Sequence, residues 1–275
     1  MKTLPRQIIT TLGLVALGLV STTVQAQITG FGGNGTGWTL NNGSGAAASV
    51  TSDVLNIVSG YGVGNSALYD TPQNITAFNA SFVWQNTQGP NGDGFSPADG
   101  MTFILENQGT SAVGGGGSGL GYQGISPASG VAFNLYDGHV IGMGYAPTTV
   151  GNGSYGYSST GSVNFDSTDP ISVNISYTGG LLGVSLEDDT TLATYSTSYS
   201  VNLPSDAGGN TAYVGFTGGS GAGESDQFIS DFTFGPRAPA PHPGPAPGSA
   251  PDGGLTSALL AGALGLLGVA RRRMG

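Results

Sequence analysis

The chain has 275 residues, of which 51 are Gly and none is Cys, and its 6 Lys and Arg against 16 Asp and Glu give a net charge of −10. The lack of Cys excludes disulfides, thiolate metal sites and thiol nucleophiles. Residues 27–236 contain no Lys or Arg, yet hold every acidic residue except Asp252. Nucleic-acid binding and phosphoryl transfer depend on cationic side chains, so neither is expected of this segment. Its Asp, Asn, Ser and Thr suit a hard cation or a neutral, hydroxyl-rich molecule such as a sugar.

The first 26 residues are predicted to be a secretory signal peptide. Lys2 and Arg6 precede the apolar run 8–20, and the segment ends at Ala26 after small or modest residues. This order is typical of signal peptides, and the run is shorter than the roughly 20 residues of a membrane span. We therefore expect the mature chain to begin at Gln27, with a retained N-terminal anchor as the alternative.

Residues 27–235 are predicted to form one all-β domain. No window in this stretch has the sustained 3.6-residue apolar period of a helix, whereas an apolar residue at every second position is typical of half-buried antiparallel strands. Turn signals such as Glu187–Asp189, read as a solvated hairpin turn, separate these runs. Many short strands without a helix predict a large β-sandwich. The strand patterns lie at 78–84, 171–177, 195–203 and 228–234.

The C-terminal part is predicted to hold a linker and a membrane segment. Residues 236–250 have Pro at nearly every second position, which neither a sheet nor a helix accommodates, so we expect an extended spacer. The apolar run 255–270 then precedes three arginines. As a helix, this run would span about 24 Å of a hydrocarbon core of about 30 Å, and the arginines would stay on the cytoplasmic side.

The last segment, 251–275, resembles the C-terminal sorting signals of the PEP-CTERM class. Its motif Pro251, Asp252, Gly253 and Gly254 is most similar to the VPDSG-type variant, with Ala250 in place of the usual Val. The resemblance implies that the inner membrane holds the exported protein transiently, until an exosortase cuts near the motif. It also implies a Gram-negative host that makes exopolysaccharide. We expect a secreted or cell-surface bacterial protein, with a permanent anchor by residues 255–270 as the alternative.

Three segments of the middle domain are similar, in order and spacing, to motifs of the legume-type (L-type) lectins, especially their bacterial extracellular relatives. The resemblance covers about residues 29–235 and implies a concanavalin-like jelly-roll sandwich of antiparallel sheets. It rests on Ala98–Leu105, on Gly119–Tyr122 with Val131–Tyr136, and on Ala212–Gly218 with Phe228–Phe232.

The resemblance implies a shallow sugar site built from loops. Asp99, preceded by a cis peptide bond from Ala98, would accept hydrogen bonds from two sugar hydroxyls. The Gly-rich loop 114–119 would donate a backbone N–H, through Gly117, Ser118 or Gly119. Two plainer interpretations stay open: Asp99 as a turn aspartate that stabilises its own corner, and the Gly-rich loop as a flexible, linker-like segment.

The rest of the family's site is incomplete in this chain. An Asn that contacts the sugar aligns with Gly138, so Asp137 or Asn134 would have to substitute. The family's strand carries a Glu and an Asp that help to hold calcium and a transition metal, whereas the corresponding residues here are Ala132 and Asn134. A two-metal site is therefore not expected, and one weak Ca²⁺ between Asp99, Asn134 and Asp137 is left open. His139 has no set of ligands at suitable spacing.

An enzyme is not expected. A glycoside hydrolase on this fold would need two carboxylates across a cleft, but Glu106, Glu187 and Glu224 belong to no E-x-D-x-x-E pattern. The sequence also lacks the G-x-S-x-G of a nucleophile elbow. We therefore expect an exported, non-catalytic, lectin-like protein that binds a neutral glycan, such as the exopolysaccharide of its own cell. The alternative is a structural matrix or surface protein that has kept the fold but lost sugar and metal binding.

Overall fold

The computed structural model describes residues 27–87, 97–147 and 155–237. The chain divides into two units, residues 1–237 and 238–275, and all described residues belong to the first. The predicted signal peptide, sorting motif and apolar run 255–270 lie outside the described residues. Within the described part, no helix has the length and apolar character that crossing a membrane requires.

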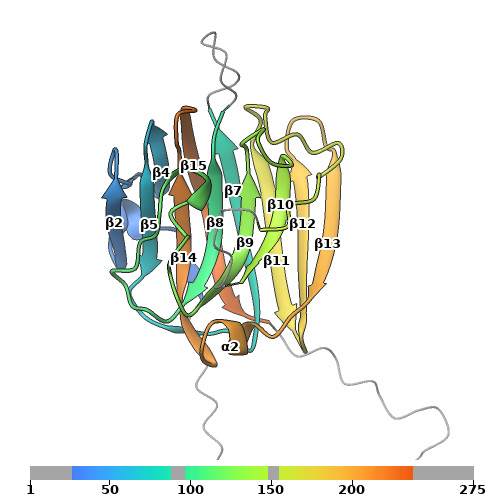
Figure 1. Cartoon of the computed structure of the whole chain (residues 1–275). Helices are drawn as coiled ribbons and strands as arrows, with labels where there is room; N and C mark the ends of the chain where they lie inside the picture. The colour runs from blue at the N-terminus through green and yellow to red at the C-terminus, as the bar shows by residue number, and fades with distance from the viewer. Residues whose placement is uncertain (1–26, 88–96, 148–154, 238–275) are drawn as a thin grey trace, which may run out of the picture. The chain divides into compact units, whose positions relative to one another are not determined.

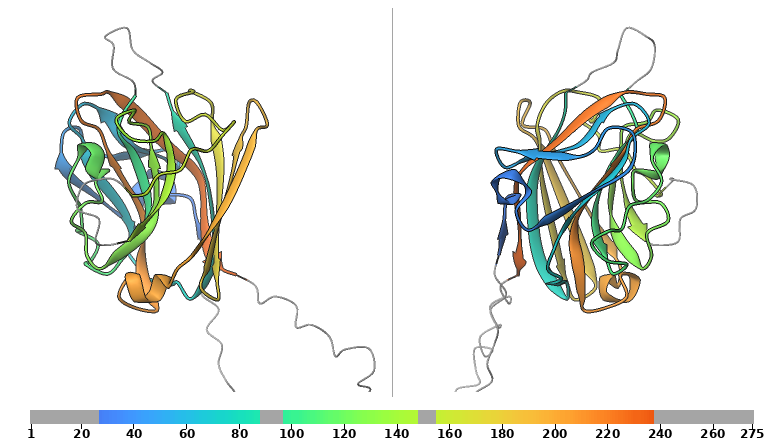
Figure 2. Two further views of the ribbon diagram at one scale, coloured as in Figure 1. Left: turned by 45° about the vertical axis from the view of Figure 1, so that its right-hand side comes forward. Right: turned by 90° about the vertical axis from the view of Figure 1, so that its left-hand side faces the viewer.

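Two antiparallel sheets pack face to face (Figures 1 and 2), which confirms the predicted β-sandwich. In the eight-stranded sheet, here the back sheet, β1 pairs with β15, and in the seven-stranded front sheet β6 pairs with β14. The back sheet has the order β13 (Thr194–Ser200), β12 (Leu181–Asp188), β11 (Ile171–Thr178), β7 (Ala77–Asn86), β15 (Ser225–Pro236), β4 (Val54–Gly60) and β3 (Ser49–Thr51), with β1 (Ile28–Thr29) at its side. The front sheet has the order β10 (Gly142–Pro147), β9 (Ala128–Asn134), β8 (Gly100–Glu106), β14 (Thr211–Gly219), β5 (Gly64–Tyr69) and β2 (Trp38–Ser44), with β6 (Gln73–Asn74) at its side.

The core between the sheets contains many aromatic side chains, and in several strands of the back sheet buried residues alternate with polar ones. On β11 and β7, burial alternates from residue to residue, as the two-residue period predicts. The ring centroid of Phe216 lies 5.0 Å from that of Phe82 and 5.0 Å from that of Phe232, edge to face in both pairs. Such contacts across the two sheets add to the free energy gained by burying apolar area.

A third layer covers the outer face of the front sheet. Segment 107–127 runs over this face, and its Leu120 and Tyr122 belong to a second apolar cluster with Ile104 of β8 and Ala132 of β9. The Tyr122 hydroxyl donates to the carbonyl oxygen of Ala146, 2.7 Å away. Because both of their faces are covered, β8 and β9 are buried at every residue. The same layer holds the short helix η1 (Gly117–Gly119).

Two predicted element ends are wrong, and two short helices were not predicted. The strand predicted over 195–203 ends at Ser200, and Leu203 begins the four-residue helix α2 (Leu203–Asp206). The Asn202 side chain accepts the backbone N–H of Ser205 and caps this helix. A second four-residue helix, α1 (Gly32–Gly35), follows β1. Pro236, assigned to the linker, is the last residue of β15 and pairs with Phe78.

The predicted solvated turn Glu187–Asp189 is also corrected. Glu187 and Asp188 belong to β12, and the Asp188 side chain is buried. One of its carboxylate oxygens accepts the backbone N–H groups of Thr190 and Thr191, at 2.9 and 2.8 Å. The carboxylate therefore closes the turn from inside and does not project into water, because the turn's own donors need a buried acceptor.

Candidate functional site

Asp99 lies at the start of β8, where three strands of the front sheet end together. The peptide bond from Ala98 to Asp99 is cis, where the resemblance places it. The Asp99 N–H donates to the carbonyl of Gly219 at 3.0 Å, and its carbonyl accepts the N–H of Leu135 at 2.8 Å. The Ser225 hydroxyl donates to the Ala98 carbonyl at 2.7 Å. Bonds from β14, from β15 and from Leu135, the residue after β9, therefore fix the position of the Asp99 backbone.

The Asp99 carboxylate lies beside two glycines, Gly117 and Gly221. A Cβ atom would lie 3.1 Å from its Oδ2 if added to Gly221, and 3.8 Å if added to Gly117. The side chain is only 5% exposed, and its Oδ2 has no hydrogen-bond partner among the described residues. Burial raises the pKa of Asp99 from 3.8 to about 6, against the opposing effect of a hydrogen bond from the Gly221 backbone. A buried acceptor without a donor is unfavourable, so Asp99 Oδ2 is suited to accept a hydrogen bond from a hydroxyl group.

The Gly-rich loop lies beside the Asp99 carboxylate through Gly117 and is held by hydrogen bonds. The N–H of Gly117 donates to the Ser220 carbonyl at 3.1 Å, and that of Gly119 donates to the Gly116 carbonyl at 3.1 Å. A Cβ on Gly116 would lie 2.4 Å from the carbonyl oxygen of Val63, so only glycine allows this close approach. The loop is thus packed, unlike a flexible linker. Since Gly117 and Gly119 use their N–H groups within the protein, Ser118 is the member of the predicted trio with a backbone donor that no described residue uses.

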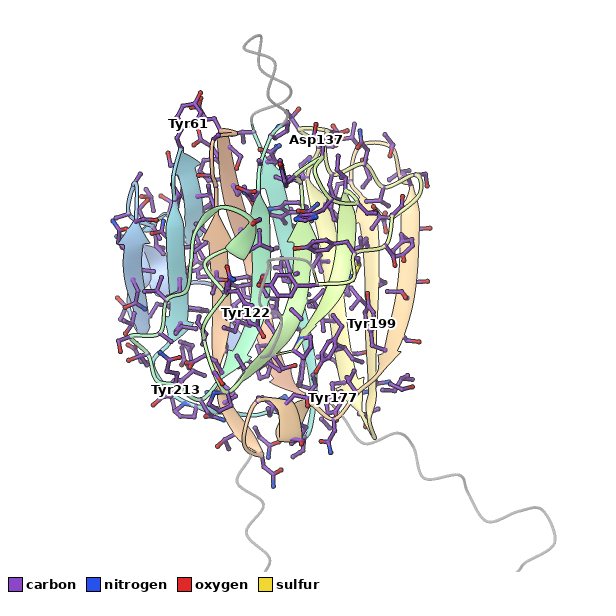
Figure 3. The ribbon with its side chains drawn as sticks, viewed as in Figure 1. Tyr61, Tyr122, Asp137, Tyr177, Tyr199 and Tyr213 are labelled. Carbon is purple, nitrogen blue, oxygen red and sulfur yellow. The ribbon has the colours of Figure 1, made fainter. Side chains whose placement is uncertain are left out.

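The turn between β4 and β5 extends the same rim. The Ser220 hydroxyl donates to the Gly60 carbonyl at 2.6 Å and accepts the N–H of Val63 at 3.1 Å, while the Gly62 N–H donates to the Gly221 carbonyl at 3.0 Å. Tyr61, at the tip of this turn, is 51% exposed. Figure 3 shows Tyr61 and Asp137 at one end of the sandwich. This end therefore presents both a buried carboxylate and an exposed aromatic ring.

The loop after β9, residues 135–141, forms the opposite side of the site. Asn134 is buried and its carboxamide nitrogen, Nδ2, donates to the carbonyl oxygens of Tyr136 at 2.9 Å and Val140 at 3.0 Å. Asp137 is exposed and lies close enough to Asp166 to raise the pKa of that carboxyl, after the larger effect of burial. His139 contacts the ring of Tyr136 edge to face, with centroids 5.6 Å apart.

The residues of this loop do not fit the two-metal site that the resemblance implies. No group of three or more His, Cys, Asp or Glu side chains gathers anywhere in the described ranges. The Asn134 Nδ2 donates to the two loop carbonyls, while its Oδ1 is buried with no hydrogen-bond partner among the described residues. The amide nitrogen must face these carbonyls, because carbonyl oxygens only accept hydrogen bonds. A cation held between Asp99, Asn134 and Asp137 remains a prediction for a binding experiment.

Several residues of the site were not predicted from the sequence. Gly221 and Ser220 belong to the Gly- and Ser-rich tract 218–223, which follows the third lectin-like motif, but only the fold places that tract beside Asp99. Tyr136 and Tyr61 are exposed aromatic residues in loops. A tyrosine between glycines, as at Tyr61, is the sequence signal that could have been used.

The overall architecture is that of the legume lectins. No protein-family model matches the chain. Lectin II from Ulex europaeus is 19% identical with a TM-score of 0.63, over 78% of this chain and 100% of that chain. Lectin I-B4 from Griffonia simplicifolia, in its metal-free form, is 17% identical with a TM-score of 0.63, again over 78% and 100%. The winged bean acidic lectin complexed with methyl-α-D-galactose is 22% identical with a TM-score of 0.61, over 76% and 97%. The chain thus has the jelly-roll fold of the legume lectins.

Proposed function

We propose that this protein is a non-catalytic lectin that binds a neutral glycan at Asp99. The observation that carries the proposal is the Asp99 Oδ2 atom, a buried acceptor with no hydrogen-bond partner among the described residues, which lies beside Gly117 and Gly221. A sugar hydroxyl would supply the missing donor. The structural neighbour from winged bean was solved with a galactoside, which supports a monosaccharide unit as the ligand.

The electrostatics of the site support binding over hydrolysis. A glycosidase pair needs a second carboxylate within about 5–9.5 Å of the first, and two carboxylates so close raise each other's pKa values. The pKa of Asp99 is raised by burial, with no contribution from another carboxylate. The absence of Lys and Arg from residues 27–236 also makes an anionic polysaccharide an unfavourable ligand, which leaves a neutral one.

Adding a methyl group beside Asp99 Oδ2 tests this proposal. In Gly221→Ala, the new Cβ would lie 3.1 Å from Asp99 Oδ2, over the oxygen that the sugar hydroxyl must reach. We expect at least a tenfold loss of affinity for any glycan found on an array, with little change in melting temperature, since Gly221 does not have a positive φ. Isothermal titration calorimetry measures the loss.

Gly115→Ala is the matched control. It lies in the Gly-rich loop, has no positive φ, and its Cβ would meet only Gln123, at 3.6 Å or more, which is an ordinary van der Waals contact. Its affinity is expected to equal that of the wild type. Equal affinities of all three proteins would place the sugar away from Asp99.

We also propose that the lectin acts outside a bacterial cell, on exopolysaccharide. The signal peptide 1–26, the motif at Pro251–Gly254 and the basic C-terminus support export, a transient stay in the inner membrane and cleavage by an exosortase-type enzyme. Mass spectrometry of the protein secreted by its host tests this: we expect a chain that begins at Gln27 and ends near the motif. A secreted chain with an intact Met1 or Gly275 would contradict it.

One observation favours a second candidate, a structural matrix or surface protein without sugar binding. Ala132 and Asn134 occupy strand positions where the L-type resemblance implies metal-binding carboxylates. If the protein has lost sugar binding together with metal binding, the purified protein will bind no glycan. It would still be incorporated into the extracellular matrix, and Asp99→Asn would not change that incorporation.

A further inference from the structure

The loop 135–141 must be held in place if the site is to keep its shape, because it adjoins Asp99 directly. Leu135 donates its N–H to the Asp99 carbonyl at 2.8 Å, and Asn134 pairs with Gly100 across β8 and β9. In the lectins that the sequence resembles, cations support this region. Among the described residues, no group of three or more His, Cys, Asp or Glu side chains is placed to hold a metal ion, and a different group contacts the loop.

Asn134 makes the contacts that would fix the loop. Its Nδ2 lies 2.9 Å from the carbonyl oxygen of Tyr136 and 3.0 Å from that of Val140, so a single amide group joins the two ends of the loop to the last residue of β9. The side chain is only 1% exposed. Losing these bonds would remove the donor to the Val140 carbonyl and leave the Tyr136 carbonyl with the N–H of His139, 3.1 Å away.

The chemistry of this arrangement depends on the amide. An aspartate at position 134 would place a negative oxygen against the two carbonyl oxygens, and these three acceptors would repel one another unless a cation lay between them. The two N–H groups of the amide supply positive charge to the same carbonyls without any ion. We infer that the Asn134 side chain takes over the role of a bound cation in fixing loop 135–141, so that the site is formed without metal.

The inference rests on the proposed function only where glycan binding is concerned, and its test needs no glycan. The full chain is compared in EDTA, in Ca²⁺ and in Mn²⁺, by melting temperature and by amide hydrogen exchange of residues 135–141. For the wild type we expect no shift in melting temperature beyond about 1 °C and equal exchange rates under the three conditions. A rise in melting temperature, or slower exchange of this loop, on adding either metal would overturn the inference.

Asn134→Asp provides the second arm, with Asn174→Asp as its matched control on the exposed face of β11. In EDTA we expect Asn134→Asp to lower the melting temperature by more than about 5 °C and to speed exchange in residues 135–141 at least tenfold. Ca²⁺ should partly reverse both effects, because the new carboxylate and the two carbonyls then surround a cation. Asn174→Asp should show neither effect. If residues 135–141 exchange at the wild-type rate in Asn134→Asp in EDTA, the inference is overturned. If this variant does not fold, the comparison of the wild type in EDTA, Ca²⁺ and Mn²⁺ tests the inference alone.

Discussion

Asp99→Asn is expected to abolish glycan binding and, at pH 7.5, to stabilise the fold. The carboxylate is almost fully buried, its Oδ2 lacks a partner among the described residues, and burial raises its pKa to about 6. At pH 7.5 it is therefore ionised in surroundings that disfavour the charge. The neutral amide removes this penalty, so we expect an increase of about 1–3 kcal/mol in the free energy of unfolding. The affinity should fall at least about 100-fold, because an amide N–H group replaces one of two acceptors.

The pH dependence of stability gives the sign of this effect. Because the pKa of Asp99 is higher in the folded chain, about 6, than its ordinary value of 3.8, the folded state binds more protons between these two values. The stability that protonated Asp99 contributes is complete below pH 3.8 and is lost as the pH rises through 6. The advantage of Asp99→Asn over the wild type should therefore disappear near pH 4.

Urea unfolding of both proteins from pH 4 to 8 checks this prediction, with the exposed Asp189 replaced by Asn as the control. The control should leave both glycan affinity and stability unchanged. If Asp99→Asn is less stable than the wild type at pH 7.5, groups of the native protein itself stabilise the negative charge of the carboxylate. In that case the carboxylate would not be held ready for a ligand.

Gly100→Ala is expected to cause the largest loss of stability. Gly100 has a φ of 138°, and an added Cβ would lie 2.0 Å from the carbonyl oxygen of Phe133 and 3.2 Å from the Cα of Asn134. These are backbone atoms of the neighbouring strand, so β8 and β9 would have to separate beside the site. We expect a loss of at least about 4 kcal/mol, or failure to fold. Urea unfolding measures the change.

The variant Gly161→Ala introduces alanine at a positive φ without a steric clash. Its φ is 64°, but an added Cβ would meet nothing within 4 Å, so only the cost of the left-handed conformation remains, about 1 kcal/mol. The difference between the two variants reports the close approach of β8 and β9 together with the less favourable φ of Gly100. Similar losses in both would mean that the two strands can move apart, and that the backbone of Asp99 is less firmly held than its hydrogen bonds indicate.

The antiparallel sandwich could be predicted because most strands of the back sheet have one face in the core and one in water. The alternation of Ile171, Val173 and Ile175 with polar residues is a direct consequence of that placement. The strands β8 and β9 carry no such signal, since segment 107–127 covers their outer face and every residue is buried. They were located through the resemblance of their motifs.

Local chemistry explains the places where the sequence was misinterpreted. Val201 and Leu203 continue the alternation of the preceding strand, yet Asn202 begins a helix by capping Ser205, and the pattern cannot show which of the two wins. Asp188 looks like a surface acid until its partners, the N–H groups of Thr190 and Thr191, are known.

The candidate site was predicted only in part, because its members come from distant segments. Asp99 and the Gly-rich loop followed from motif resemblance, and both lie in one cluster. Gly221 could not be assigned to the site, since its contact with Asp99 depends on the pairing of β14 with β8. The role that we infer for Asn134 could likewise not be predicted from the sequence. The sequence shows only a missing metal ligand, and the fold shows which carbonyls the Asn134 amide contacts.

The central claim is that Asp99 binds a neutral glycan at a site formed without metal. A glycan microarray probed with the full chain in EDTA and again in Ca²⁺ tests it most directly, with Asp99→Asn as the paired sample. We expect at least one neutral glycan to be bound equally in both buffers and not by Asp99→Asn. Absence of binding above background, or binding that EDTA abolishes, would contradict the claim.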